Sequence, residues 1–277
     1  MKNVLVLTDF SNPAYAALFY ISGLFRNKEV SFLILNTFPE ATTADTPGGK
    51  SRAGRLEDKA WEGLTRTEHR IRLDKPNPKH TFRTQAIAGN LSNAVLSVLE
   101  QGETDLIVMG NKGASHKKGI FMGSNVIRIL NAVNNCAVLA VPEEATQDRP
   151  QEIAFASAFN TDYRPESLRL LLEIATMCSA AIRVVHINEE ERLSEAQMEN
   201  LNGLMSFMGN TAHTLHWIPD FRTKAGALHS FISEKGIGML VMVHQKHGFL
   251  DTLLGEPVIR KIQFMVNVPL LVLPERK

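Results

Sequence analysis

The chain has 277 residues, about twice the length of a typical domain of roughly 100 to 150 residues, so we expect two domains. Its 30 basic and 29 acidic side chains nearly balance, and because there is no basic tail or long block of like charge, no nucleic-acid partner is expected. No apolar stretch approaches the length of about 18 residues that a membrane span needs, and the first residues, MKNVLVLTDF, are unlike a signal peptide, so we expect a cytoplasmic protein with no membrane partner.

The first half of the chain alternates apolar runs of strand length with stretches of helical periodicity. The predicted strands are Val4–Leu7, Ser31–Leu35, Thr81–Ala86, Leu106–Met109 and Ala137–Val141. The predicted helices start at Asn12 and Pro13, in the charged stretch Arg52–Arg72, near Leu91, and at the pair Gly123 and Ser124. This alternation is typical of a parallel sheet covered by helices on both faces.

Three further features give narrower expectations. Residues 39–55 are rich in Pro, Gly and Thr without periodicity, which predicts a mobile surface loop. Cys136 and Cys178 lie in apolar contexts and match no metal or redox spacing, so we expect two buried free thiols. Two histidine pairs are spaced by three, as in some zinc sites: His213, His216, His244 and His247. Within a strand that spacing points the two rings to opposite faces, so we do not expect them to bind metal.

The second half of the chain repeats the order of the first with few gaps, which indicates duplication of one unit. IAFASAFN at 153–160 matches VLVLTDFS at 4–11, and MLVM at 239–242 matches LIVM at 106–109. The polar segment Glu143–Arg149 separates the two copies and is predicted to be a short linker.

The most informative motif follows the apolar run LIVM in the first half. Gly110, Gly113, Gly123 and Ser124 stand there in the spacing Gly-x2-Gly-x9-Gly-Ser. Glycines let backbone N–H groups approach a bulky anion, and a hydroxyl at a helix start adds a donor where the helix dipole already favours negative charge. The spacing therefore predicts a phosphate-binding loop, and it occurs intact only once in the chain.

The alternating strands, the first strand ending in TDFS at 8–11, and this glycine spacing together resemble the universal stress protein family. Because of the repeat, the chain resembles a tandem universal stress protein, with one domain over residues 1–143 and a second over 150–277. The resemblance implies an α/β fold in which each domain is doubly wound around a five-stranded parallel sheet of order 3-2-1-4-5. It also implies ATP at the carboxyl ends of strands 1 and 4, where the strand order reverses.

The resemblance also implies a role for each matching residue. Backbone contacts with ribose and phosphates would come from Gly110, Asn111, Lys112 and Gly113, and contacts with the far phosphates from Gly123, Ser124 and Asn125. Thr8 and Asp9 would lie beside the sugar and a Mg²⁺ ion bound with the nucleotide, although Asp9 also suits a turn or a helix cap. The adenine would be walled by Leu35, Asn36 and the segment 87–89, which includes Ala88.

The second half departs from the motif at the same places. Val243 and Lys246 stand against Gly110 and Gly113, Glu256 and Pro257 stand against Ser124 and Asn125, and Ala158 stands against Asp9. A carboxylate at the phosphate end repels the ligand, and a proline removes an N–H donor. The sequence therefore predicts one adenine nucleotide per chain, bound by the first half only.

Three functions remain open from the sequence. The first is a regulatory, stress-response binding module whose two domains pair about a pseudo-twofold axis as an intramolecular dimer, with further homodimerisation left open. The second is an enzyme, either a slow ATP hydrolase or an adenylyl-transfer protein. The third is a nucleotide-free scaffold that binds another small molecule. Because no catalytic constellation is recognisable, we expect the binding module, with at most weak ATPase activity.

Overall fold

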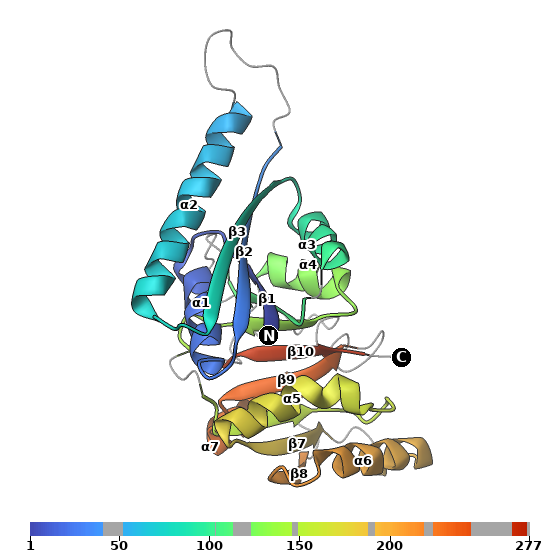
Figure 1. Ribbon diagram of the computed structural model, residues 1–277. Helices are drawn as coiled ribbons and strands as arrows, with labels where there is room; N and C mark the ends of the chain where they lie inside the picture. The colour runs from blue at the N-terminus through green and yellow to red at the C-terminus, as the bar shows by residue number, and fades with distance from the viewer. Residues whose placement is uncertain are drawn as a thin grey trace. The chain divides into compact units, whose positions relative to one another are not determined.

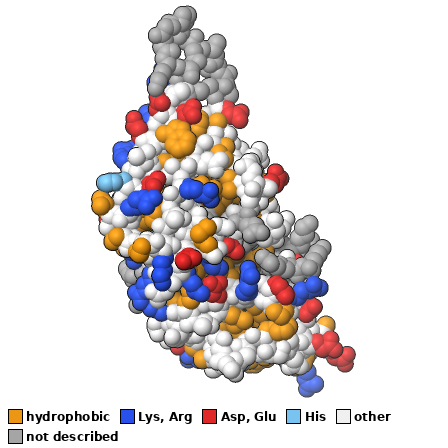
Figure 2. Space-filling view, viewed as in Figure 1, with side chains coloured by type: hydrophobic (Ala, Val, Ile, Leu, Met, Phe, Trp, Pro, Cys, Tyr) orange, Lys and Arg blue, Asp and Glu red, His pale blue; other side chains and the backbone are white. Residues whose placement is uncertain are grey.

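The computed structural model describes residues 1–40, 52–102, 104–112, 123–145, 149–187, 192–218, 224–244 and 268–275. Contacts divide the chain into two compact units, and the main division falls between Glu143 and Glu144. Within the described residues, no helix is long and apolar enough to cross a membrane. On the face seen in Figure 2, basic and acidic side chains are interspersed rather than gathered by sign.

The first half alternates strands and helices as the sequence predicts. Its elements are β1 (Lys2–Leu7), α1 (Asn12–Leu24), β2 (Val30–Phe38), α2 (Arg52–Asp74), β3 (His80–Ala88), α3 (Leu91–Gln101), β4 (Leu106–Gly110), α4 (Ser124–Ala132) and β5 (Ala137–Val141). The strand order is β3-β2-β1-β4-β5, and β2, β1 and β4 pair in parallel. Helices α1 and α2 lie on one face of the sheet and α3 and α4 on the other (Figure 1), which confirms the doubly wound fold.

Each helix of the first half buries its predicted apolar face. In α1 the buried stripe is Ala14, Ala17, Leu18, Ile21 and, at the helix end, Phe25. The helix begins at the predicted Asn12, but its cap is the residue before, Ser11, whose side chain accepts a hydrogen bond from the Ala14 N–H. Helix α2 already begins at Arg52, so the end of the predicted loop 39–55 is helical instead. Residues 41–51 of that predicted loop lie outside the described residues.

The second half repeats this architecture. Its elements are β6 (Glu152–Ala156), α5 (Pro165–Cys178), β7 (Ala181–Ile187), α6 (Glu195–Met208), β8 (His213–Ile218), α7 (Lys224–Lys235), β9 (Met239–His244) and β10 (Leu270–Pro274). Its strand order is β10-β9-β6-β7-β8, which is again 3-2-1-4-5 when read from the other end. Cys136 and Cys178 are both free and buried, as predicted.

Strand registers define which residues of the two halves are counterparts. The N–H of Thr8 donates to the Leu35 carbonyl at 2.9 Å, and the N–H of Ser157 donates to the Val185 carbonyl at 3.0 Å. Thr8 and Ser157 are therefore counterparts, and Asp9 corresponds to Ala158 as the sequence repeat predicts. On the other side of the central strand, Val6 pairs with Val108 and Phe155 pairs with Val241. This register makes Val243 the counterpart of Gly110.

Candidate functional site

The turn after β1 is held by its own side chains. The Thr8 Oγ1 accepts a hydrogen bond from the N–H of Phe10 at 3.0 Å. The Asp9 Oδ1 accepts one from the N–H of Ser11 at 3.1 Å and one from its hydroxyl at 2.5 Å. These bonds stabilise a left-handed backbone at Phe10, whose φ is 64°. Asn36 at the end of β2 donates to the Thr8 carbonyl at 2.8 Å, so the ends of β1 and β2 are tied together.

The end of β4 brings two helix starts to the same place. The N–H of Gly123 donates to the Asn111 carbonyl at 2.6 Å, which fixes the start of α4 beside the end of β4. A Cβ atom on Gly110 would lie 2.8 Å from the carbonyl oxygen of Pro13 at the start of α1. Glycine is therefore required at position 110 by the packing of α1 against β4, whether or not a ligand approaches.

The start of α4 offers unused hydrogen-bond donors. Its N-cap, Gly123, has no side chain to cap the helix. The N–H groups of Ser124 and Asn125 form no hydrogen bond with any other described residue, and both residues are exposed. Free N–H groups at a helix start, together with the positive end of the helix dipole, attract an anion.

These features meet in a pocket of about 280 Å³ at the carboxyl ends of β1, β2 and β4. Its lining contains eight residues predicted from the sequence: Thr8, Asp9, Asn36, Gly110, Lys112, Gly123, Ser124 and Asn125. Three others do not line it: Leu35 and Asn111, which are buried, and Ala88, which lies exposed at the end of β3. The last, Gly113, lies outside the described residues.

Six more residues line this pocket that the sequence did not single out: Leu7, Ala14, Thr37, Leu91, Met109 and Val126. Most are apolar and follow the ordinary periodicity of the core. Only their position could have identified them from the sequence, because each stands at or near the end of an element that reaches this edge of the sheet.

One buried atom beside the pocket lacks a partner within the described part of the chain. The Oδ1 atom of Asn111 is buried and accepts no hydrogen bond there. A buried acceptor without a donor is costly, and a ribose hydroxyl or a water molecule would satisfy it. Elsewhere in the described ranges, no group of three or more His, Cys, Asp and Glu side chains is placed to hold a metal ion.

The sequence profile of the universal stress protein family matches residues 1–142. The chain belongs to this family. A universal stress protein from Archaeoglobus fulgidus DSM 4304 has a similar solved structure, with a TM-score of 0.71 at 16% identity over 99% of this chain and 96% of that one. A putative universal stress protein from Pseudomonas aeruginosa UCBPP-PA14 gives 0.59 at 15% identity over 99% and 93%. These likenesses show the fold, and no curated protein sequence matches the chain.

The second half of this universal stress protein builds the same turn after its first strand. The Ser157 Oγ accepts a hydrogen bond from the N–H of Phe159 at 2.8 Å, and Phe159 has a φ of 56°. The Nδ1 of His186, the counterpart of Asn36, donates to the Ser157 carbonyl at 3.0 Å. The Tyr163 hydroxyl bonds to the Ser157 Oγ, and burial raises the pKa of Tyr163 to about 12.

What differs is the ring at the centre of the turn. Phe159 is fully buried and stacks on His186 with ring centroids 4.8 Å apart, whereas Phe10 in the first half is 40% exposed. Trp217 packs edge-on against His186, and its counterpart on β3 is Ala86. Phe159 and Trp217 thus pack against His186, whose counterpart in the first half, Asn36, lines the pocket. The predicted changes at Lys246, Glu256 and Pro257 lie outside the described residues.

Proposed function

We propose that the first half of this protein, residues 1–143, binds an adenine nucleotide, ATP together with Mg²⁺, and that the protein acts as a regulatory binding module. The observation that carries the proposal is the pocket at the ends of β1, β2 and β4, which gathers most of the residues that the family motif assigns to the nucleotide. Its place, where the strand order reverses, is where open α/β sheets bind ligands.

The phosphate end of the pocket fits an anion. Ser124 and Asn125 bring the first N–H groups of α4 to the lining, and Lys112 on the lining adds a positive charge. The pocket volume of about 280 Å³ is close to the lower limit of roughly 300 Å³ for small-molecule sites. Residues 113–122, which join Lys112 to Gly123, lie outside the described residues.

The sugar and base end fits a nucleoside. Asp9 places a carboxylate on the lining, the ligand type that Mg²⁺ prefers, and a bound Mg²⁺ would neutralise phosphate charge there. The unsatisfied Oδ1 of Asn111 would accept a hydrogen bond from a ribose hydroxyl. Asn36 and Thr37 lie at the end of β2, where the base would be placed.

We propose further that the second half, residues 150–277, keeps the fold without this ligand. Ala158 supplies no carboxylate where the first half has Asp9, and Val243 adds a side chain where the first half has Gly110. His186 stands in place of Asn36, and the ring of Phe159 stacks on it. Together these changes support one nucleotide per chain.

The test is a calorimetric titration of the full chain with ATP in the presence of Mg²⁺. We expect one site per chain, and Ser124→Glu should weaken binding about a hundredfold, since a carboxylate would stand where the phosphates bind. The same change places an acid at a helix start, which favours the helix, so the fold should be retained. Ser124→Ala is the matched control and should weaken binding by about tenfold at most.

Two results would contradict the proposal. Two equal sites would show that the second half also binds nucleotide, and unchanged affinity in Ser124→Glu would show that the phosphates lie elsewhere. Inorganic phosphate should be measured in the same samples, because sustained release that Asp9→Asn removes would indicate a hydrolase instead. Pairing of the two halves about a pseudo-twofold axis and further association of chains stay predictions from the sequence.

A further inference from the structure

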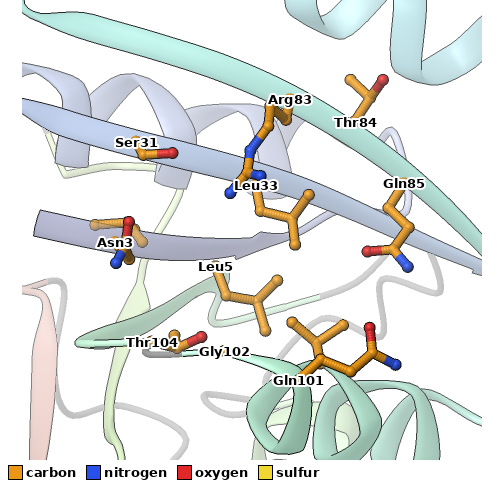
Figure 3. A pocket seen from close by; sticks show the side chains of 12 residues that line it. Asn3, Leu5, Ser31, Leu33, Arg83, Thr84, Gln85, Gln101, Gly102 and Thr104 are labelled. Atoms are coloured by element: carbon orange, nitrogen blue, oxygen red, sulfur yellow. The ribbon is translucent and has the colours of Figure 1, made fainter.

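The first half contains a second pocket, of about 430 Å³, between strands β1, β2 and β3 and helix α3 (Figure 3). Its lining shares no residue with the candidate nucleotide pocket. The floor is apolar and consists of Leu5, Leu33 and Val98. Polar side chains surround this floor, and Figure 3 shows the amides of Gln85 on β3 and Gln101 on α3 approaching the groove from opposite sides.

A single charged side chain lines this groove among the described residues. Arg83 extends from β3 toward Leu33 on the neighbouring strand (Figure 3), with which it is paired in register. It forms no hydrogen bond or ion pair with any part of the chain that the structure describes. An arginine beside an apolar floor, with no acid bonded to it among the described residues, can pair with a carboxylate brought by a ligand.

At the counterpart of this groove, the second half carries an ion pair. Register places Arg183 at the position of Leu33 and Glu152 at the position of Asn3. The Arg183 guanidinium donates to both carboxylate oxygens of Glu152, at 2.6 and 2.8 Å. It also donates to the hydroxyl of Thr214, the counterpart of Arg83, at 2.9 Å. The Glu152 carboxylate raises the pKa of Arg183 further above its usual range.

We propose that the open groove of the first half binds a small monocarboxylate with an apolar body, such as an aryl or short alkyl acid. The carboxylate pairs with Arg83, and the apolar body covers Leu5 and Leu33. The second half shows the internal version of this arrangement, in which Glu152 is the carboxylate. The C-terminal end of α3, at Gln101 and Gly102, also lines the groove, and its negative dipole end disfavours a multiply charged anion such as a phosphate.

The test uses 4-phenylbutanoate as the probe and its uncharged amide, 4-phenylbutanamide, as the comparison. Binding to the full chain is followed by the amide NMR signals of Leu33, Gln85 and Gln101. We expect 4-phenylbutanoate to shift these backbone signals until binding saturates. We expect 4-phenylbutanamide to bind at least about tenfold more weakly. Arg83→Gln should weaken binding of 4-phenylbutanoate by about the same factor. Because Arg83 is exposed, this substitution should leave the fold intact.

Two more variants separate this groove from the nucleotide pocket. The double variant Asn3→Glu with Leu33→Arg rebuilds the ion pair of the second half in the groove and should abolish probe binding. Ser124→Glu, which alters the candidate nucleotide pocket, should leave probe binding unchanged. The proposal is overturned if acid and amide bind equally, if Arg83→Gln has no effect, if the shifts lie around Ser124 instead, or if no groove signal moves up to about 10 mM probe.

Discussion

The two halves of this universal stress protein use one turn for two purposes. In both, a hydroxyl at the end of the first strand accepts the N–H of a left-handed phenylalanine two residues on. In the first half the ring of Phe10 lies against α2, where a Cβ on Gly63 would be 2.5 Å from it, and the pocket beside Asn36 stays open. In the second half the ring of Phe159 stacks on His186. The turn therefore belongs to the fold, and the direction of the ring differs between the two halves.

The groove beside α3 differs between the two halves in a similar way. Where the first half has Leu33 and an Arg83 that pairs with no described residue, the second half has Arg183 bonded to Glu152. At both places the first half has a pocket. At the corresponding places of the second half, its own side chains contact one another. Among the described residues, the second half thus has side-chain contacts at both places where the first half has a pocket.

The largest expected effect tests the role of the ring. Phe159→Ala should lower the free energy of unfolding by about 3 to 5 kcal/mol, because it empties the centre of a buried aromatic cluster. Phe10→Ala, at the counterpart position, should cost less than about 1 kcal/mol, since its ring is 40% exposed. Chemical denaturation of both variants gives the difference. Equal losses would show that the two rings do the same structural work.

The next effect tests the glycine at the end of β4. Gly110→Val, which installs the second-half residue, should destabilise the protein by about 3 kcal/mol, since its Cβ would collide with backbone atoms of Pro13. The second half avoids this collision because Pro165 follows Ser157 by eight positions, whereas Pro13 follows Thr8 by five. The reciprocal Val243→Gly should cost about 1 to 2 kcal/mol through lost burial and added chain entropy.

A midpoint of denaturation unchanged by Gly110→Val would contradict this account. Loss of ATP binding by this variant would not by itself show that Gly110 contacts phosphate, because the collision also displaces the start of α1. Ser124→Glu remains the cleaner test of ligand contact.

A smaller effect tests the ion pair that closes the second half. Glu152→Gln should lower the free energy of unfolding by about 1 kcal/mol, since the pair is bidentate but both side chains are 26% exposed. The control is Asn3→Gln at the counterpart position, which should be neutral because no ion pair depends on it. The effect of Glu152→Gln should shrink in 1 M salt, and a loss independent of salt would point to packing instead.

Sequence periodicity was sufficient to predict the fold of the first half, since each apolar run became a strand of a doubly wound sheet. The strand order came from the family resemblance, and with that order the rule that ligands bind where the order reverses placed the pocket. Leu35 does not line the pocket, whereas Asn36 and Thr37, which follow it on β2, do. The direction of the two phenylalanine rings was not predictable. The sequence around both is similar, and the outcome depends on distant partners, Gly63 in one half and Trp217 in the other.

The smallest expected effect is a loss of stability in acid, which both halves should share through one histidine each, the buried His80 and the partly buried His216. Burial lowers the pKa of His80, and its Nε2–H donates to the Phe25 carbonyl while Nδ1 is buried without a partner in the described part of the chain. Burial, with the charges of Arg183 and Lys235, lowers the pKa of His216.

A histidine whose pKa is lower in the folded state binds more protons when unfolded. Its contribution to stability is therefore complete above the ordinary pKa of 6.5 and is lost as the pH falls from there toward the folded-state pKa. The free energy of unfolding should decline over this window. His80→Gln should reduce the slope, whereas His69→Gln, on the exposed face of α2, should leave it unchanged. If both variants keep the slope of the parent chain, protonation of His80 is not what weakens the first half in acid.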